Sequence, residues 1–184
     1  MFHDPANFEV SAVLESHWEE IRDEYVALPD QSFDPWVQQS MHGEGWSVFG
    51  LIAGGMKLPG SKYCPRTTEI LGRFKTVGLA GFSRMAPATH ILPHCGWATN
   101  EYRLHLGLVV PAGCRLKVED ETRVWQEGKC LVFDDTAIHE AWNDSDQLRG
   151  NLMVDFLRPG KTEFSINNVP PDVIEYVKGL LEEN

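Results

Sequence analysis

Hydrophobic positions recur at helical spacing near the two ends of the chain and at strand spacing between them. In residues 8–28 apolar side chains fall three or four positions apart with charged residues between them, which predicts an amphipathic helix. Residues 64–74 predict a short helix with Pro65 in its first turn, and residues 171–181 predict a final helix. Residues 46–53 are rich in β-branched and aromatic residues and predict a strand.

From residue 77 the pattern changes to short apolar runs separated by Pro, Gly and Asn. The predicted strands are residues 78–85, 103–110, 114–119, 129–133, 137–142 and 148–157. Because no long helix alternates with them, a sandwich or jelly roll is expected rather than a parallel sheet. No repeat or linker divides the chain, so residues 1–184 are expected to form one domain. Its core would span about residues 77–159, with the terminal helices packed on it.

Two of these strands alternate apolar and polar residues, so each has one apolar face and one polar face. Arg103 and His105 share the polar face of the first strand, opposite Leu104, Leu106 and Leu108. The polar face of the second strand carries the following residues: Arg149, Asn151, Met153 and Asp155. In a jelly roll such a face can line the mouth of the barrel, where small ligands bind.

The strand of His139 and the strand of Arg149 are joined by the short segment Asn143–Gln147, which predicts a hairpin. If Trp142 pairs with Leu148 in that hairpin, His139 and Arg149 point to the same face. A slip of one residue would reverse this result, because neighbouring residues face opposite sides of a sheet.

Composition narrows the classes of partner. The formal net charge is −11 and no basic run is present, so nucleic acid and anionic membrane surfaces are poor partners. No apolar run approaches the roughly 20 residues that span a bilayer, and the first residues do not form a signal peptide. We therefore expect a bacterial cytoplasmic protein that acts on a peptide or a small molecule. Exposed strand edges could also support a homodimer.

The four cysteines form no CxxC pair, so neither a zinc ribbon nor a disulfide framework is expected. Cys114 and Cys130 lie among apolar residues and are expected in the core. Cys95 follows His94, but we expect it to be a bystander rather than a ligand.

His94 and His139 are the candidate metal ligands. Mononuclear non-heme iron centres commonly use two histidines and one carboxylate, and the first part of that motif is usually HxD or HxE. Here Gly96 stands where the carboxylate would be, so the standard motif fails. Two histidines can still hold iron if water fills the remaining position. His90 is the main competitor for the first ligand, and Asp134 and Asp135 are expected in a supporting or turn role.

Arg149 is the candidate partner for an organic-acid cosubstrate, because the planar guanidinium matches a carboxylate. Ser83 could contact the same carboxylate, and His105 could donate a hydrogen bond to the near carboxylate of a dicarboxylic acid. Trp125 and Trp142 are expected to pack rather than to form a substrate platform.

The chain resembles the aspartyl/asparaginyl β-hydroxylase family of iron(II)- and 2-oxoglutarate-dependent dioxygenases. The resemblance is carried by the following segments: PH at 93–94, RLHLGLVVP at 103–111, ETRVWQEGK at 121–129, FDDTAIHEAWN at 133–143 and LRGNLMVDFLRP at 148–159. It extends more weakly upstream and covers about three quarters of the chain. It implies a double-stranded β-helix, the jelly roll of the cupin type.

The resemblance also implies roles for individual residues. His94 and His139 match the family's iron(II) ligands, and the family has Gly at the position of the usual carboxylate. Arg149, Ser83, His105 and the main chain of Met85 match positions that bind 2-oxoglutarate, and Arg103 matches an arginine that engages the substrate's carboxylate. Dioxygen is the second cosubstrate.

This chain has one more residue between His94 and Arg103 than the eukaryotic members of the family. The resemblance therefore implies the substrate less strongly than it implies the residues that bind the metal and the cosubstrate. The expected reaction is hydroxylation at the β-carbon of an Asp or Asn residue, of a free amino acid or of a related small molecule. Two other functions stay open at this point. They are a cupin-like metalloenzyme that does not use 2-oxoglutarate and a non-catalytic binding module on the same scaffold.

Overall fold

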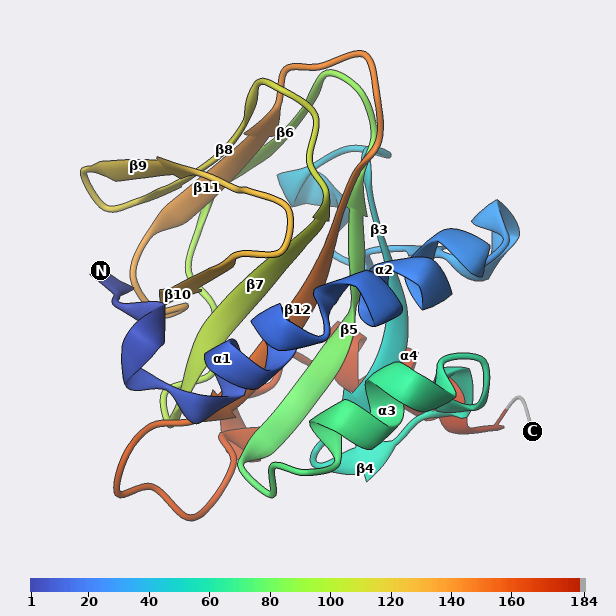
Figure 1. The fold of residues 1–184 in the computed structure, drawn as a ribbon, viewed down its shortest axis with the longest axis vertical. Coiled ribbons are helices and arrows are strands. Elements are labelled where there is room, and N and C mark those ends of the chain that lie inside the picture. The colour runs from blue at the N-terminus through green and yellow to red at the C-terminus, as the bar shows by residue number, and fades with distance from the viewer. Residues whose placement is uncertain (183–184) are drawn as a thin grey trace.

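The computed structural model describes residues 1–182, and two antiparallel sheets that face each other form its centre (Figure 1). The major sheet has the strand order β1 (Phe2–His3), β10 (Cys130–Phe133), β7 (Glu101–Val109), β12 (Arg149–Leu157), β5 (Val77–Met85), β3 (Trp46–Ala53) and β2 (Asp34–Pro35), with β4 (Met56–Lys57) paired to β3. The minor sheet has the order β6 (Thr89–His94), β11 (His139–Asn143), β8 (Cys114–Val118) and β9 (Glu121–Val124). The expected mainly β, jelly-roll fold is confirmed.

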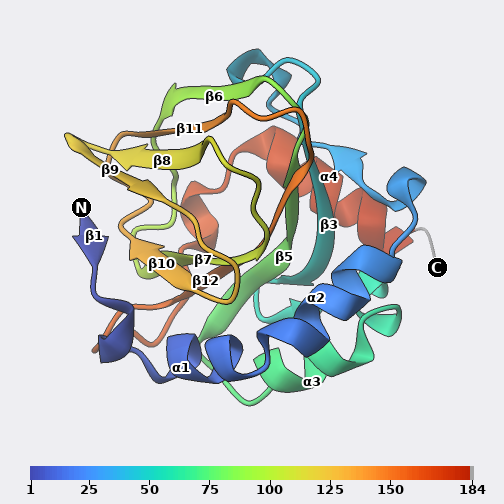
Figure 2. The ribbon, with the colours of Figure 1, turned by 45° about the horizontal axis from the view of Figure 1, so that its top comes forward.

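Three helices cover the outer face of the major sheet, while a fourth lies on the other side of β3 (Figures 1 and 2). The three are α1 (Glu9–Ser16), α2 (Trp18–Ala27) and α3 (Pro65–Leu71), and the fourth is α4 (Pro171–Glu182). Short 3₁₀ helices occur at Pro5–Asn7, Asp30–Ser32, Gln39–Met41, Pro59–Lys62 and Ile166–Asn168. In the part of the chain that the structure describes, no helix is long and apolar enough to cross a membrane.

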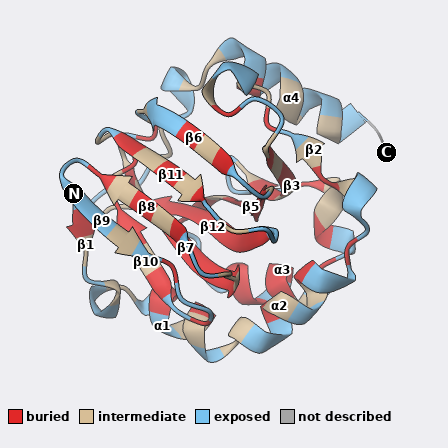
Figure 3. Cartoon of the chain, turned by 90° about the horizontal axis from the view of Figure 1, so that it is seen from above, coloured by how far each residue is buried: buried red, intermediate tan, exposed pale blue. Residues whose placement is uncertain are grey.

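Two apolar cores lie on the two faces of the major sheet. The outer core packs Leu14, Ile21 and Ile70 of the helices against Phe82 and Leu152 of the sheet, all of them fully buried. The inner core lies between the two sheets and includes residues such as Met85, Leu116 and Phe133. Figure 3 shows that the buried residues concentrate on the central strands.

The alternation predicted for β7 and β12 is confirmed. Leu104, Leu106 and Leu108 belong to the outer core. Arg103 pairs with Asp155 in the sheet register, and His105 pairs with Met153, so the polar faces of the two strands lie side by side. Since the other face is closed by α1 and α2, the polar face is the one turned toward the minor sheet.

The predicted hairpin of His139 and Arg149 is wrong. β11 pairs with β6 and β8 in the minor sheet, and β12 pairs with β5 and β7 in the major sheet. β12 has buried residues on both faces and hydrogen-bonded neighbours on both edges, so no edge is left for β11. The segment between the two strands crosses from one sheet to the other.

The single helix predicted for residues 8–28 is interrupted at His17, which has φ −115° and ψ 14°. Leu14 and Ile21 are both fully buried on the two sides of the break, so the apolar pattern continues across it and does not reveal it. Five strands were not predicted: the two-residue strands β1, β2 and β4, and the longer strands β6 and β9. β6 contains Pro93 and β9 is rich in charged residues, and both lie at an end of the minor sheet, where such residues are tolerated.

At Gly150 the helix α2 packs closely on the sheet through the side chain of Tyr25. A Cβ at this position would overlap the ring and hydroxyl of buried Tyr25. We expect Gly150→Ala to lower the free energy of unfolding by about 1–3 kcal/mol, because the rigid ring must move in a packed core. Urea denaturation measures this.

Gly179 on α4 provides the matched control. It is exposed, and nothing lies within 4 Å of the Cβ that Ala would add there. Gly179→Ala should raise the free energy of unfolding by about 0.5–1 kcal/mol through helix propensity alone. Equal effects of the two substitutions would contradict the packing described for Gly150.

Candidate active site

His94 and His139 face each other across the pairing of β6 with β11. They are direct partners in the antiparallel register, and their ring centroids lie 4.2 Å apart. His94 Nδ1 lies 2.8 Å from the carbonyl oxygen of Leu92, and His139 Nδ1 lies 2.9 Å from that of Ala137. These main-chain acceptors place the proton on Nδ1 and leave Nε2 of each ring as a lone-pair donor, the arrangement common to metal-binding histidines.

Both imidazoles are held in the neutral form, which is the form that binds a metal. Burial lowers the pKa of His94, and burial together with the proximity of His94 lowers the pKa of His139 to about 3. No protons therefore have to be displaced at neutral pH when a cation enters.

Asp135 fills the space that the usual carboxylate ligand would need. A Cβ added to Gly96 would overlap the carboxylate of Asp135, whose Oδ1 lies 3.5 Å from His139 Nε2. The Gly96 N–H donates to the Asp135 carbonyl oxygen at 2.7 Å. Asp135 Oδ2 is buried without a hydrogen-bond partner. The supporting position expected for Asp135 agrees with this geometry.

Arg103 connects Asp135 to the major sheet. Its Nη1 donates to Asp135 Oδ1 at 2.5 Å, and its Nε and Nη2 donate to Asp155 at 2.8 and 2.7 Å. All three side chains are buried. Although burial opposes it, the two carboxylates raise the pKa of Arg103. The guanidinium expected to bind a substrate carboxylate thus already donates to two side-chain carboxylates.

Arg149 is buried without a carboxylate partner. The side chain is 1 % exposed, and its Nη1 donates to the Ser83 carbonyl oxygen at 3.3 Å and lies 3.5 Å from Ser83 Oγ. The Trp125 ring lies 4.8 Å from the guanidinium carbon, and the Asn151 amide, turned so that its oxygen faces Arg149, accepts at 2.9 Å. We call Ser83, His105, Trp125, Arg149 and Asn151 the anion pocket.

Unpaired groups in the anion pocket fit an acidic ligand. Arg149 Nε and both ring nitrogens of His105 are buried and lack hydrogen-bond partners. Burial lowers the pKa of Arg149 to about 10 and, with the charge of Arg149, lowers the pKa of His105 well below its usual value. A bound carboxylate would satisfy both side chains, since unpaired buried donors are costly.

The remaining candidates are placed as follows. Met85 is buried and pairs with Arg149 in the register, and its carbonyl oxygen accepts from Asn143 at 3.0 Å. His90 stacks on Trp142 and its Nε2 lies 3.0 Å from Glu140, so the structure separates it from the ligand pair. Cys95 is exposed, whereas Cys114 and Cys130 are buried as expected.

Sequence reasoning did not select Asn151 or Asp155 as site residues, although it placed both on the correct face of β12. Their shared face with Arg149 was the signal that could have identified them. Trp125 packs as expected, but it packs directly on Arg149 and 5.9 Å from the His105 ring.

The two imidazoles of His94 and His139 fit iron(II), provided that the remaining ligands of the ion come from outside the chain. Among residues 1–182 no three His, Cys, Asp or Glu side chains converge to form a metal cluster. Two neutral imidazoles would therefore hold the ion together with a cosubstrate and water, and the unpaired groups of the anion pocket offer a place for that cosubstrate.

The fold and these two sets of residues define a jelly-roll protein in which two neutral histidines face each other, in the same barrel interior as a buried arginine that lacks a carboxylate partner. The sequence model of the aspartyl/asparaginyl β-hydroxylase family matches residues 15–159, and the chain belongs to this family. By its description this is a hydroxylase family.

Two relatives illustrate its range. The chain is 36% identical over 167 residues to the mouse aspartyl/asparaginyl beta-hydroxylase, a match that covers 85% of this chain but 22% of that protein. It is 34% identical over 174 residues to the ornithine lipid ester-linked acyl 2-hydroxylase of Rhizobium tropici, covering 87% and 61%. The chain thus spans about a fifth of the mammalian relative and three fifths of the bacterial one.

A solved structure shows the same fold. It is an oxidoreductase of the 2OG-Fe(II) oxygenase family from Burkholderia pseudomallei, with a TM-score of 0.55 and 16% identity. The match covers 88% of this chain and 93% of that protein.

Buried neutral histidines should make the metal-free protein less stable in mild acid. The unfolded chain takes up protons as the pH falls below about 6.5, whereas folded His139 and His105 do not, so stability decreases as the pH is lowered. We expect the free energy of unfolding to fall by about 1 kcal/mol for each such histidine between pH 7 and pH 5.5. Urea titrations at both pH values measure it, and His139→Asn should show a smaller decrease. The same pH dependence in both proteins would contradict the assignment.

Proposed function

We propose that this chain is an iron(II)- and 2-oxoglutarate-dependent dioxygenase that hydroxylates an unactivated C–H bond. The observation that carries the proposal is the buried Arg149, which lacks a carboxylate partner and lies in the same barrel interior as the pair of neutral histidines. Iron(II) with 2-oxoglutarate and dioxygen supplies the oxidation, in which the cosubstrate becomes succinate and carbon dioxide.

The chain's own residues would bind, orient and exclude water. His94 and His139 would hold the ion through Nε2, and Arg149 with Ser83 would hold the far carboxylate of 2-oxoglutarate. His105 would donate to the near carboxylate, and the main chain at Met85 borders the same pocket. Buried Trp125 packs over the Arg149 guanidinium, so a charge pair with a bound carboxylate would form away from solvent, where it is strong.

The family name makes the β-carbon of an Asp or Asn residue the first candidate for the reacting position, in a peptide, a free amino acid or a related small molecule. Arg103 would then contact the substrate's carboxylate while it keeps Asp135 and Asp155 as partners. The acidic net charge supports a partner other than nucleic acid or an anionic membrane, and we keep the bacterial cytoplasm as the expected location.

The two alternatives are distinguished by turnover. A cupin-like metalloenzyme of another type would bind the metal without consuming 2-oxoglutarate. A non-catalytic module would show no metal-dependent turnover at all. The two facing histidines and the separately buried guanidinium of Arg149 together support the dioxygenase, because neither alternative needs Arg149.

Anaerobic addition of 2-oxoglutarate to the iron(II)-loaded protein should produce a visible charge-transfer band. His139→Ala should abolish the band and the formation of succinate, because one of only two side-chain ligands is lost. His90→Ala is the matched control and should keep both, since His90 stacks on Trp142 away from the pair. A normal band in His139→Ala would remove His139 from the metal site.

Arg149→Gln should weaken the binding of 2-oxoglutarate by at least about 30-fold, the lower bound for the loss of a buried charge pair. Titration of the band with 2-oxoglutarate measures the change. Arg73→Gln, at an exposed arginine on the protein surface, should leave the affinity unchanged. An unchanged requirement in Arg149→Gln would place the cosubstrate elsewhere.

A further inference from the structure

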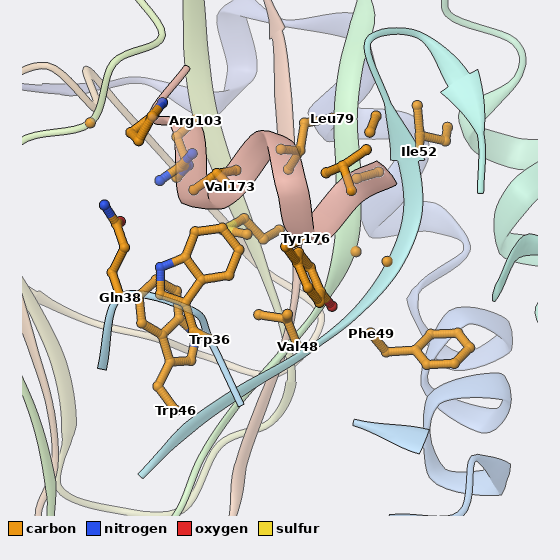
Figure 4. A pocket seen from close by; sticks show the side chains of 18 of the residues that line it. Trp36, Gln38, Trp46, Val48, Phe49, Ile52, Leu79, Arg103, Val173 and Tyr176 are labelled. Atoms are coloured by element: carbon orange, nitrogen blue, oxygen red, sulfur yellow. The ribbon is translucent and has the colours of Figure 1, made fainter. Parts of the chain in front are cut away.

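An apolar cavity of about 210 Å³ extends from His94 to the space beneath α4 (Figure 4). One end is formed by His94, Gly96 and Arg103, so it lies beside one of the two candidate metal ligands. The lining includes none of the residues of the anion pocket. A molecule held in this cavity would therefore reach His94 without displacing an acid bound by Arg149.

Four aromatic side chains from separate segments of the chain line this cavity. Trp97 follows His94 closely in the sequence, and its ring is nearly parallel to that of Trp36, with centroids 6.4 Å apart. The Trp36 ring also lies 5.2 Å from the Trp46 ring and 6.2 Å from the Tyr176 ring. We call Trp36, Trp46, Trp97 and Tyr176 the ring cluster.

The aromatic and aliphatic parts of the lining lie in different places. In Figure 4 Trp36 lies on the same side of the cavity as Arg103, while Ile52 lies on the other side. Residues such as Leu58 and Leu180 form the end beneath α4. A ligand whose reacting carbon lies beside His94 would therefore place the adjoining group against the ring cluster.

The volume of the cavity suits one aromatic side chain. An apolar cavity of about 150 Å³ holds a benzene molecule, and this cavity is larger at about 210 Å³. Aromatic rings gain energy from offset or edge-to-face contacts with other rings, beyond the effect of the area that they bury. A phenyl, phenol or indole group would fill most of the space, whereas an aspartate side chain would leave the ring cluster uncovered.

The charges beside the cavity favour a neutral side chain. Arg103 already donates to Asp135 and Asp155, so an added carboxylate would compete with both of them in a buried site. A cationic side chain would be repelled by the guanidinium of Arg103 and by a metal ion held at His94. A neutral ring avoids both costs.

We propose that the cavity binds the aromatic side chain of an amino acid, free or within a peptide, and that the β-carbon of this residue is hydroxylated. The inference rests on the proposed function and replaces Asp or Asn by an aromatic residue as the expected substrate. The ring contacts the ring cluster, and the β-carbon lies beside His94. One oxygen atom of dioxygen converts a β C–H bond into C–OH, and the other enters succinate as 2-oxoglutarate loses carbon dioxide.

The N-acetyl amides of phenylalanine, cyclohexylalanine and aspartate test the class of side chain in the metal-free protein. The fluorescence of Trp36, Trp46 and Trp97 should report occupancy of the cavity. The phenylalanine amide should bind about threefold more tightly than the cyclohexylalanine amide, because contacts between rings add to the effect of burial. The aspartate amide should bind at least about tenfold more weakly than the phenylalanine amide, because it buries little apolar area.

Turnover by the iron-loaded protein tests the reacting carbon. The phenylalanine amide should stimulate succinate formation more than the aspartate amide. With two deuterium atoms on the β-carbon, it should give a product that has gained one oxygen and kept one deuterium. A product that has gained oxygen and kept both deuterium atoms would overturn the assignment of the β-carbon.

Trp36→Leu tests the ring cluster. Trp36 is buried and lies near each of the other three rings, so its loss should abolish the preference for phenyl over cyclohexyl. Trp142→Leu is the matched control and should keep the preference, because Trp142 stacks on His90 and does not line the cavity. If Trp36→Leu does not fold, Val173→Phe provides the test. It adds a ring at a buried position of α4 that lines the cavity, and it should weaken binding of the phenylalanine amide about tenfold.

The outcomes separate this inference from the function on which it rests. If the charge-transfer band forms but only the aspartate amide stimulates turnover, the aromatic assignment is overturned and the dioxygenase stands. If the phenylalanine amide binds with the expected preference but no band forms, the cavity holds a ring, and the hydroxylation fails together with the dioxygenase. A cyclohexylalanine amide that binds as tightly as the phenylalanine amide, or a preference that Trp36→Leu leaves intact, would overturn the role of the ring cluster.

Discussion

The ion cluster of Arg103, Asp135 and Asp155 is the interaction on which the rest of the site depends. It joins adjacent strands of the major sheet to the segment that leads into β11, so it connects the two sheets at the site. A buried triad of this kind costs desolvation energy and does not by itself stabilise a fold, but removing one partner is expensive. In this protein the cluster positions a carboxylate. It holds Asp135 beside His139, where any side chain at position 96 would overlap it, so position 96 requires glycine.

Much of the site could be predicted because β-strands alternate faces. Arg103, His105 and Arg149 were expected on polar faces opposite leucine-rich ones, and the structure confirms those faces. The ligand pair itself needed the family resemblance, since His94-Cys95-Gly96 lacks the usual carboxylate. The ligand-binding roles assigned to the site residues stay predictions: His94 and His139 for the metal, Ser83, Met85, His105 and Arg149 for the cosubstrate, and Arg103 for the substrate.

What could not be predicted depends on contacts between distant segments. The sequence does not show which sheet a strand joins, and the short connection before Arg149 favoured a hairpin where the chain crosses between sheets. The replacement of the missing carboxylate by Asp135, about forty positions away, is visible only in three dimensions. The cavity beneath α4 likewise combines tryptophans from three separate segments with a helix from the far end of the chain.

The register pairing of His94 with His139 would let a bound metal ion connect β6 to β11. β6 is the edge strand of the minor sheet and pairs with β11. An ion held by both imidazoles would cross-link these two strands. The residues that follow His94 form one rim of the cavity. An ion bound by both rings would therefore add a cross-link to the main-chain hydrogen bonds between β6 and β11 and restrain the residues that follow His94.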